Sequence, residues 1–401
     1  MTYALEHLKV IDAASYLAGP AAATVLADYG AAVTKIEPLQ GDGYRLLVGP
    51  YRVPYHWQLT SRNKRSIALD LRQSAGQEVL HKLVSDADVL LTNFRPDQLS
   101  DFNMTFEQMS ALNERLVVAH ITGYGVEGPD ANMRAFDATA WWARSGMMDL
   151  VREPGQLPLQ GAGGFGDHAT GMSLFAAIMM GLYERERSGK GSLVSTSLAA
   201  NGAWANGMQI QGKIAGFDNN AWRQQKGIAS PFNNTYLTAD GRHVVICMTN
   251  PAREWPELAT ALGHSEWLDD ERYETARLVF RHQDEVREMV GAAIAMMSLS
   301  ELRVMLDKHK IAYGLVQNLD DVVEDEQFKA NGILVKTASE DPDYQWTVGS
   351  PLQIAGKQKR PPEMAPEVGA HSYEILTELG YSEPQIAELM ASRSVAGPAD
   401  D

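Results

Sequence analysis

The N-terminal third of the chain alternates between short apolar runs and helical segments, and this alternation constrains the fold more than any other feature. A strand–helix–strand unit about 25 residues long is typical of a parallel strand pair. The sequence therefore predicts an α/β fold with a Rossmann-like, doubly wound parallel sheet. The predicted strands are 8–12, 32–36, 66–71, 88–94 and 116–122, and the predicted helices are 20–30, 76–87 and 105–113.

A length of 401 residues favours two domains over one compact core. The composition turns polar and loop-like over 218–235. It is followed by a predicted hairpin at 236–248 and predicted helices at 252–262, 281–297 and 299–308, and later by a helix pair broken at Gly380. We expect a large α/β domain over 1–222, a small α+β domain over 223–330, and a segment 331–401 that returns to the large domain.

Charge and cysteine content exclude several functional classes. The net charge of −16 argues against a nucleic-acid or anionic-membrane surface. The single cysteine, Cys247, cannot form an intrachain disulfide and fits a reducing compartment, and the first residues lack the apolar run of a signal peptide. The expected location is the cytoplasm. The run 191–212 is too polar for a bilayer span and predicts an interior or interface helix.

A glycine-rich loop at 161–166 leads directly into Asp167 and a predicted helix that ends at Gly189. On residue types alone, Asp167 is favoured as the N-cap of this helix. Alternatively, the helix end favours its ionised form, and the loop N–H groups bind an anion or a developing oxyanion. His168 is a general base or, more often in such a position, a surface residue. The predicted buried face of the helix contains Met172, Phe175, Ala176, Met179, Met180 and Tyr183.

Other catalytic motifs have little support. The histidines are scattered without HExxH, and the sequence has no hydrolase elbow and no GxxxxGK[ST] loop. The glycine patterns at 123–128 and 161–166 lack the strand–turn–helix context of a dinucleotide site. Basic residues at strand ends would suit phosphates, or else form a solvated, charge-balanced edge. These residues are Arg62, Lys64, Arg65, Arg72 and Arg95.

Short motifs spread over nearly the whole chain carry a family resemblance. They include Ala18-Gly19-Pro20, Lys35-Ile36-Glu37, Asn63 to Ser66, Leu69-Asp70-Leu71, Asn93 to Pro96, Gly123-Tyr124-Gly125, Gly166-Asp167 with Gly171, Gly189-Lys190-Gly191, Asp240-Gly241-Arg242, Gly349-Ser350-Pro351 and Gly369-Ala370-His371. Together they resemble the class III CoA-transferases, the CaiB/BaiF or formyl-CoA-transferase family. No single motif is specific, but the combination is.

The resemblance implies that Asp167 is a catalytic nucleophile. In the family, this carboxylate forms a mixed anhydride from an acyl-CoA thioester and then an aspartyl-CoA thioester. Acyl-CoA and a carboxylic acid are the expected partners, without a permanently bound cofactor or metal, and the chains form an interlocked homodimer. The implied CoA contacts are Ala18, Leu69, Arg72, Asn93, Phe94, Arg95 and Arg134, and the implied oxyanion loop contains Gly163, Gly164 and Gly166.

The sequence departs from the formyl-CoA-transferase pattern at four places. Leu17 replaces a substrate-contacting glutamine, Pro38 and Asp101 replace arginines near CoA, and the glycine-rich flap expected within 223–235 is missing. Oxalate or formate specificity is therefore not expected.

Two alternatives remain beside the transferase. An α-methylacyl-CoA racemase uses a histidine–aspartate pair, but Phe136 stands at the histidine position before Asp137 and cannot move a proton. A non-catalytic acyl-CoA-binding protein would use Asp167 only as a helix cap. Trp141, Trp142 and Phe136 either wall an acyl pocket or pack in the core.

Overall fold

The computed structural model describes residues 3–47, 49–153, 155–218 and 230–398. The chain forms two compact units. The larger contains Met1–Phe217 and Gln327–Asp401, and the smaller contains Asp218–Glu326. Of the segment 223–235, from which the glycine-rich flap is missing in the sequence, residues 223–229 lie outside the described residues.

The larger unit is built on a seven-stranded sheet with the strand order β12-β3-β2-β1-β4-β5-β6. All neighbouring strands run parallel except β12, which pairs antiparallel with β3 at one edge. The predicted doubly wound α/β fold is therefore confirmed. The strands are β1 Lys9–Ala13, β2 Ala32–Glu37, β3 Arg65–Leu69, β4 Val89–Thr92, β5 Val117–Thr122, β6 Leu193–Ser197 and β12 Val395–Ala396.

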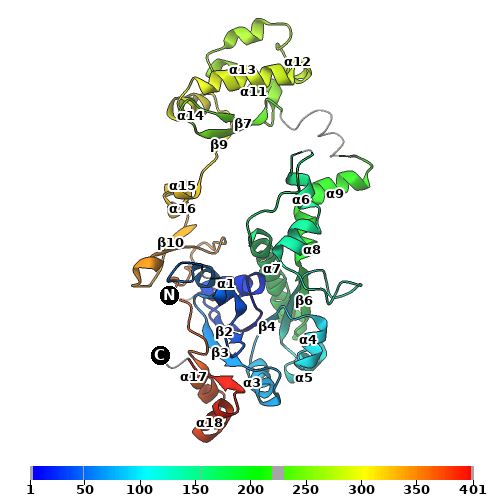
Figure 1. Cartoon of the computed structure of the whole chain (residues 1–401), viewed down its shortest axis with the longest axis vertical. Coiled ribbons are helices and arrows are strands. Elements are labelled where there is room, and N and C mark those ends of the chain that lie inside the picture. The colour runs from blue at the N-terminus through cyan, green and yellow to red at the C-terminus, as the bar shows by residue number, and fades with distance from the viewer. Residues whose placement is uncertain (1–2, 48, 154, 219–229, 399–401) are drawn as a thin grey trace. The chain divides into compact units, whose positions relative to one another are not determined.

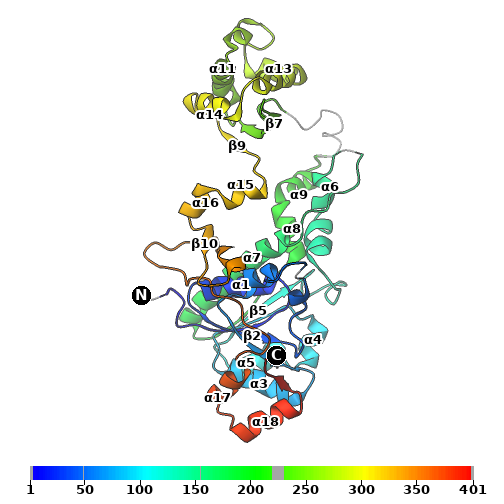
Figure 2. The same ribbon diagram turned by 60° about the vertical axis from the view of Figure 1, so that its left-hand side comes forward.

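Helices cover both faces of this sheet (Figures 1 and 2). Successive strand residues point to opposite faces, so Val10 packs in one core and Ile11 in the other. The Val10 core lies under α1 Ala18–Asp28 and α7 Phe165–Ser188, which pack against each other. The Ile11 core lies under α3 Ser74–Ser85, α5 Phe106–Leu112, α17 Ser372–Glu378 and α18 Glu383–Ala391. Burial on both faces explains why the inner strands read as continuous apolar runs.

Two helix predictions were wrong in detail. The run 191–212 begins as strand β6, and only then forms α8 Leu198–Ala205 and α9 Gly207–Ile214. The buried face of α7 is formed by smaller and branched residues such as Leu174, Ile178 and Gly181, whereas Met180 and Tyr183 are about 70% exposed. Of the predicted face, Phe175 and Met179 pack against the core and are partly buried, and the prediction was wrong for Met180 and Tyr183. The predicted stop at Gly189 is confirmed, with φ +74°.

The smaller unit has its own antiparallel sheet, in which β8 His243–Cys247 lies between β7 Asn233–Leu237 and β9 Tyr313–Leu315. The predicted hairpin around Gly241 is confirmed. Trp255 is fully buried among the helices of this unit. These are α11 Pro251–Ala261, α12 Ala276–Arg281, α13 Gln283–Ala295 and α14 Leu299–Lys308.

The remaining described elements are short. They are η1 Gly43–Leu46, α2 Tyr55–Ser61, α4 Pro96–Asp101, a π-helix η2 Asp137–Ala143, α6 Met147–Val151, η3 Ser265–Asp269, α15 Leu319–Val323, α16 Glu326–Ala330, β10 Leu334–Lys336, η4 Pro342–Tyr344 and β11 Trp346–Val348. No single helix within the described ranges has the length and apolarity of a membrane span, and only the bent pair α13–α14 meets both criteria jointly.

Candidate active site

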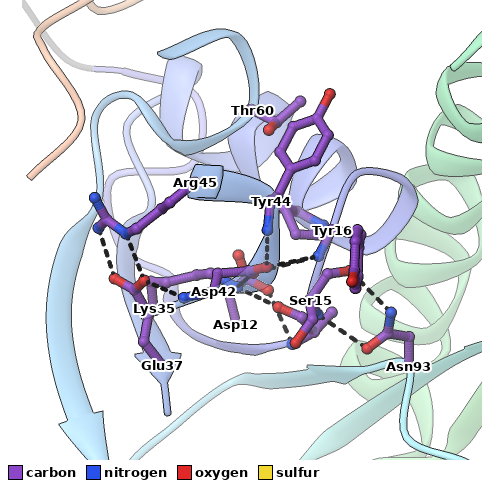
Figure 3. Close-up of polar contacts among 12 residues, drawn as sticks. Asp12, Ser15, Tyr16, Lys35, Glu37, Asp42, Tyr44, Arg45, Thr60 and Asn93 are labelled. Carbon is purple, nitrogen blue, oxygen red and sulfur yellow. Dashed lines mark hydrogen bonds and ion pairs between the residues drawn. The ribbon is translucent and has the colours of Figure 1, made fainter. Parts of the chain in front are cut away.

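The turn from β1 into α1 forms one wall of the site (Figure 3). Tyr16 adopts φ +65°, a left-handed conformation that costs of order 1–3 kcal/mol for a residue with a side chain. Ser15, the residue before Tyr16, is held by Asn93 through both of its backbone polar groups. The Asn93 Oδ1 accepts from the Ser15 N–H, and its Nδ2 donates to the Ser15 carbonyl, each at 2.9 Å. Asp42 accepts from the Tyr16 N–H at 3.1 Å. The turn is therefore fixed by side chains from two separate segments.

Buried charges support this turn from below. Lys35 Nζ lies 3.1 Å from Asp42 and also donates to the Ala14 carbonyl. Lys64 Nζ lies 2.9 Å from Asp12, and both side chains are completely buried. Burial raises the pKa of Asp12, but the charges of Lys35 and Lys64 outweigh it and hold this pKa below its usual value. Burial lowers the pKa of Lys64 to about 8.

These contacts correct the interpretation of the basic cluster. Lys64 is committed to Asp12, and Arg62 donates two hydrogen bonds to Asp28, at 3.1 and 2.8 Å, with its side chain only 2% exposed. Neither residue lies at the solvated edge that the sequence suggested. Arg72 and Arg95 are paired with Asp70 and Asp97 but remain accessible to a ligand.

The start of α7 is organised by Asp137, a buried carboxylate from η2. Its Oδ2 accepts from the Gly164 N–H at 2.8 Å, and the amides of Gly166 and Asp167 also favour its charged form. Gly164 is the N-cap and has φ +93°. A Cβ at Gly166 would lie 2.2 Å from Trp141 Cγ and 2.3 Å from Asp137 Oδ1, so this position requires glycine.

Asp167 is not the cap of α7. It is the third residue of the helix, and no hydrogen bond ties its carboxylate to the residues that the structure describes. Burial raises its pKa to about 7, and repulsion from Asp137 adds to this rise. The expectation that the helix end would favour the ionised form is therefore reversed. No cationic side chain in the described ranges counteracts this rise.

Asp167 opens into a cavity of 320 Å³ at the carboxyl ends of β1, β4 and β5. This is the position at which doubly wound sheets bind ligands. The cavity brings together several residues that the sequence singled out: Ala18, Asn93, Phe94, Arg95, Arg134, Phe136 and Asp167.

A second cavity of 280 Å³ adjoins the first, because Ser15, Phe94 and Gln98 line both. Two further residues that were assigned to ligand binding, Leu69 and Arg72, line it. Together, the two cavities can accommodate an elongated ligand with one end at Asp167.

Other candidates lie elsewhere. His168 lines a separate 560 Å³ cavity, with Met172, rather than the one containing Asp167. Gly163, Gly164 and Gly166 are not among the residues that line the Asp167 cavity. Trp141 and Trp142 are buried in a core cluster with Leu198, which favours the core-packing interpretation for them.

Sequence reasoning did not identify two aromatic residues near Asp167. Tyr16 lines the same cavity and packs edge-on against Phe136, with ring centroids 5.8 Å apart. Burial raises the pKa of Tyr44 to about 12, and the charge of Asp167 adds to this rise, so its phenol stays protonated at neutral pH. The positive φ of Tyr16 has no signature in the local sequence. The proximity of Tyr44 to Asp167 joins residues more than 100 positions apart, and it also leaves no local signal.

Residues 5–372 match the family model described as CoA-transferase family III. The chain is 30% identical, over 98% of its length and 99% of the relative, to an (R)-2-hydroxy-4-methylpentanoate CoA-transferase of Clostridioides difficile. It is 29% identical to a succinate–glutarate CoA-transferase of Agrobacterium fabrum, over 94% of this chain and 95% of the relative.

A solved structure indicates the same family. A CAIB/BAIF family protein from Brucella suis superposes with a TM-score of 0.82 at 28% identity, over 94% of this chain and all of the other. These likenesses extend over both compact units of the chain.

Proposed function

Because the chain belongs to CoA-transferase family III, we propose that it moves CoA from an acyl-CoA donor to a carboxylic acid acceptor, with Asp167 as the nucleophile. The observation that carries this proposal is the Asp167 carboxylate, which is desolvated and lacks a hydrogen-bond partner among the described residues, at the end of an elongated cavity. A carboxylate held without hydrogen bonds is a stronger nucleophile than a solvated one.

The proposed reaction proceeds by acyl transfers at one carboxylate. An Asp167 oxygen attacks the thioester carbonyl carbon, the C–S bond breaks, and CoA thiolate and a mixed anhydride form. The thiolate attacks the aspartyl carbonyl and releases the donor acid, which leaves an aspartyl-CoA thioester. The acceptor carboxylate attacks this thioester, expels CoA thiolate and forms a second mixed anhydride with Asp167. The thiolate then attacks the acceptor carbonyl of this anhydride, which gives the new acyl-CoA and restores the Asp167 carboxylate.

The CoA arm is assigned to the two adjoining cavities. In this proposal, Leu69, Arg72 and Phe94 contact the nucleotide end, and Arg95 and Arg134 bind phosphate oxygens by charge. Ala18 and Asn93 complete the contacts, although Asn93 also holds the Ser15 backbone. The large CoA-binding domain then consists of 1–222 and 331–401, with 223–330 as the small domain.

The amides of Gly164 and Gly166 favour the charged form of Asp137, and none of the three glycines lines the Asp167 cavity, so we do not include this loop among the donors to a developing oxyanion. We also propose a cytoplasmic location.

Exchange chemistry separates this proposal from its alternatives. The enzyme is incubated with acyl-CoA and a panel of labelled acids, and new acyl-CoA is measured by mass spectrometry. A racemase would exchange α-deuterium into acyl-CoA with no acid present. A non-catalytic binding protein would bind acyl-CoA but would neither transfer CoA to an acid nor exchange α-deuterium.

The raised pKa of Asp167 predicts an acid limb in the rate profile. The nucleophile must be ionised, so kcat/KM for acyl-CoA should fall about tenfold per pH unit below about pH 7. Asp137→Asn removes a repelling charge while its amide oxygen still accepts from Gly164, so the midpoint should move to lower pH. A profile that is flat from pH 5 to 8 would contradict the assignment.

We propose that the protein is a homodimer, with α8 and α9 at the interface. Trp204 and Met208 on these helices are 87% and 85% exposed, and Met180 and Tyr183 of α7 are also exposed. Large apolar side chains that are exposed to this extent are typical of protein interfaces.

Light scattering after size exclusion should give a mass twice that of one chain, which is 44.0 kDa. The double variant Trp204→Asp/Met208→Asp should elute as a monomer, since burying two carboxylates in an interface is unfavourable. Met296→Asp, at an equally exposed methionine (83%) of the smaller unit, is the matched control and should remain dimeric. A dimeric double variant would exclude α8 and α9 from the interface.

A further inference from the structure

The cavity next to Asp167 has an uneven distribution of charge. Arg95 and Arg134 are the cationic side chains that line it within the described ranges. Neither offsets the raised pKa of Asp167, to which only burial and Asp137 contribute. Arg95 is also paired with Asp97. The proposed function assigns both arginines to the phosphate groups of CoA.

The buried cations below the turn are also unavailable. Lys35 and Lys64 are 2% or less exposed and are bonded to Asp42 and Asp12. A ligand would have to break a buried ion pair to use either of them, which is strongly unfavourable.

Polar side chains such as Asn93, Gln98 and Thr122 contribute to the lining of the Asp167 cavity, but much of the lining is apolar and partly aromatic. Leu17 and Leu198 are buried, while Tyr16, Met133 and Phe136 expose 43%, 52% and 57% of their surfaces. Phe136 and Tyr16 already form an edge-to-face pair that a flat or branched substituent can extend.

From this arrangement we infer that the acceptor is a monocarboxylic acid with an apolar, branched or aromatic substituent, and not a short dicarboxylic acid. The inference rests on the proposed function, because it treats Arg95 and Arg134 as the phosphate contacts of CoA. A short dicarboxylate places its second charge roughly 5 Å from the reacting carboxylate, where it would be desolvated without a cation. An apolar substituent at the same place has a favourable free energy of transfer from water into the cavity.

The test compares acids matched in carbon number. The full-length protein is supplied with one acyl-CoA donor and either 4-methylpentanoate or adipate, and either butanoate or succinate. The formation of each acceptor-CoA is followed by mass spectrometry. We expect kcat/KM to be at least about tenfold higher for the monocarboxylate of each pair. Equal or faster use of the dicarboxylates would overturn the inference.

Substitutions at Phe136 give an independent readout. Phe136→Arg adds a cation to the wall and should shift the dicarboxylate-to-monocarboxylate ratio at least about tenfold towards the dicarboxylate, whereas Phe136→Leu should keep the original preference. An unchanged ratio in Phe136→Arg, with the protein folded and active, would count against the inference. If no acid is used and acyl-CoA leaves no label on Asp167, the transferase proposal itself fails, which distinguishes the two failures.

Discussion

Replacing Asp167 with asparagine is expected to abolish CoA exchange, with kcat lower by at least about 10⁴-fold, while acyl-CoA still binds. The amide has nearly the same size as the carboxylate but cannot form the anhydride, and the loss of a covalent nucleophile has effects of this order. Single-turnover exchange with labelled CoA measures the rate, and equilibrium binding of a non-reactive thioether analogue of acyl-CoA measures the affinity.

The same variant should be more stable than the wild type above pH 7. The folded pKa of Asp167, about 7, lies above its ordinary value of 3.8, so the unfolded chain releases this proton first as pH rises. The wild type therefore loses stability between about pH 4 and pH 7, by up to about 4 kcal/mol, and Asp167→Asn avoids this loss. Urea unfolding at pH 4 and pH 8 measures the difference.

A neighbouring substitution supplies the control for this prediction. His168→Gln alters a side chain in the separate cavity beside Met172 and should leave exchange within about threefold of the wild type. If Asp167→Asn still exchanges CoA at more than one hundredth of the wild-type rate, another residue must be the nucleophile.

The largest stability effect is expected at the buried ion pairs below the Tyr16 turn. Asp12→Ala removes the carboxylate that faces both Lys35 and Lys64, and leaves two buried ammonium groups with less compensation. Removing one partner of such a pair costs about 3–5 kcal/mol. The midpoint of urea unfolding, monitored by circular dichroism, should fall accordingly.

A surface ion pair provides the comparison. Asp86 pairs with Lys9, but both side chains are more than half exposed, so Asp86→Ala should cost about 1 kcal/mol or less. If Asp12→Ala is no more destabilising than Asp86→Ala, the buried network does not support the turn in the way proposed here.

The sequence predicted the parallel sheet because the information for it is local. Each of the first five strands is a largely apolar run of four to six residues next to a helix, and each was found close to its predicted place. The hairpin around Gly241 and the stop at Gly189 were equally local, since glycine supports the left-handed backbone that both require.

Long-range contacts could not be predicted in this way. The role of Asp137 depends on an amide 27 residues away, and Asn93 holds a backbone segment 78 residues away. The misassigned faces of α7 have a related cause. Its inner surface includes glycine and leucine where another helix approaches closely, whereas Met180 and Tyr183 are exposed. Periodicity identifies a helix but not which side of it meets a partner.

Asp137 serves two purposes with one functional group. Its carboxylate anchors the loop that begins α7 and, by repulsion, weakens the acidity of Asp167. Only a residue that keeps an oxygen facing the Gly164 amide, such as asparagine, can change the reactivity of the nucleophile without releasing the loop. Directed evolution for a lower working pH should therefore retain an oxygen acceptor at position 137.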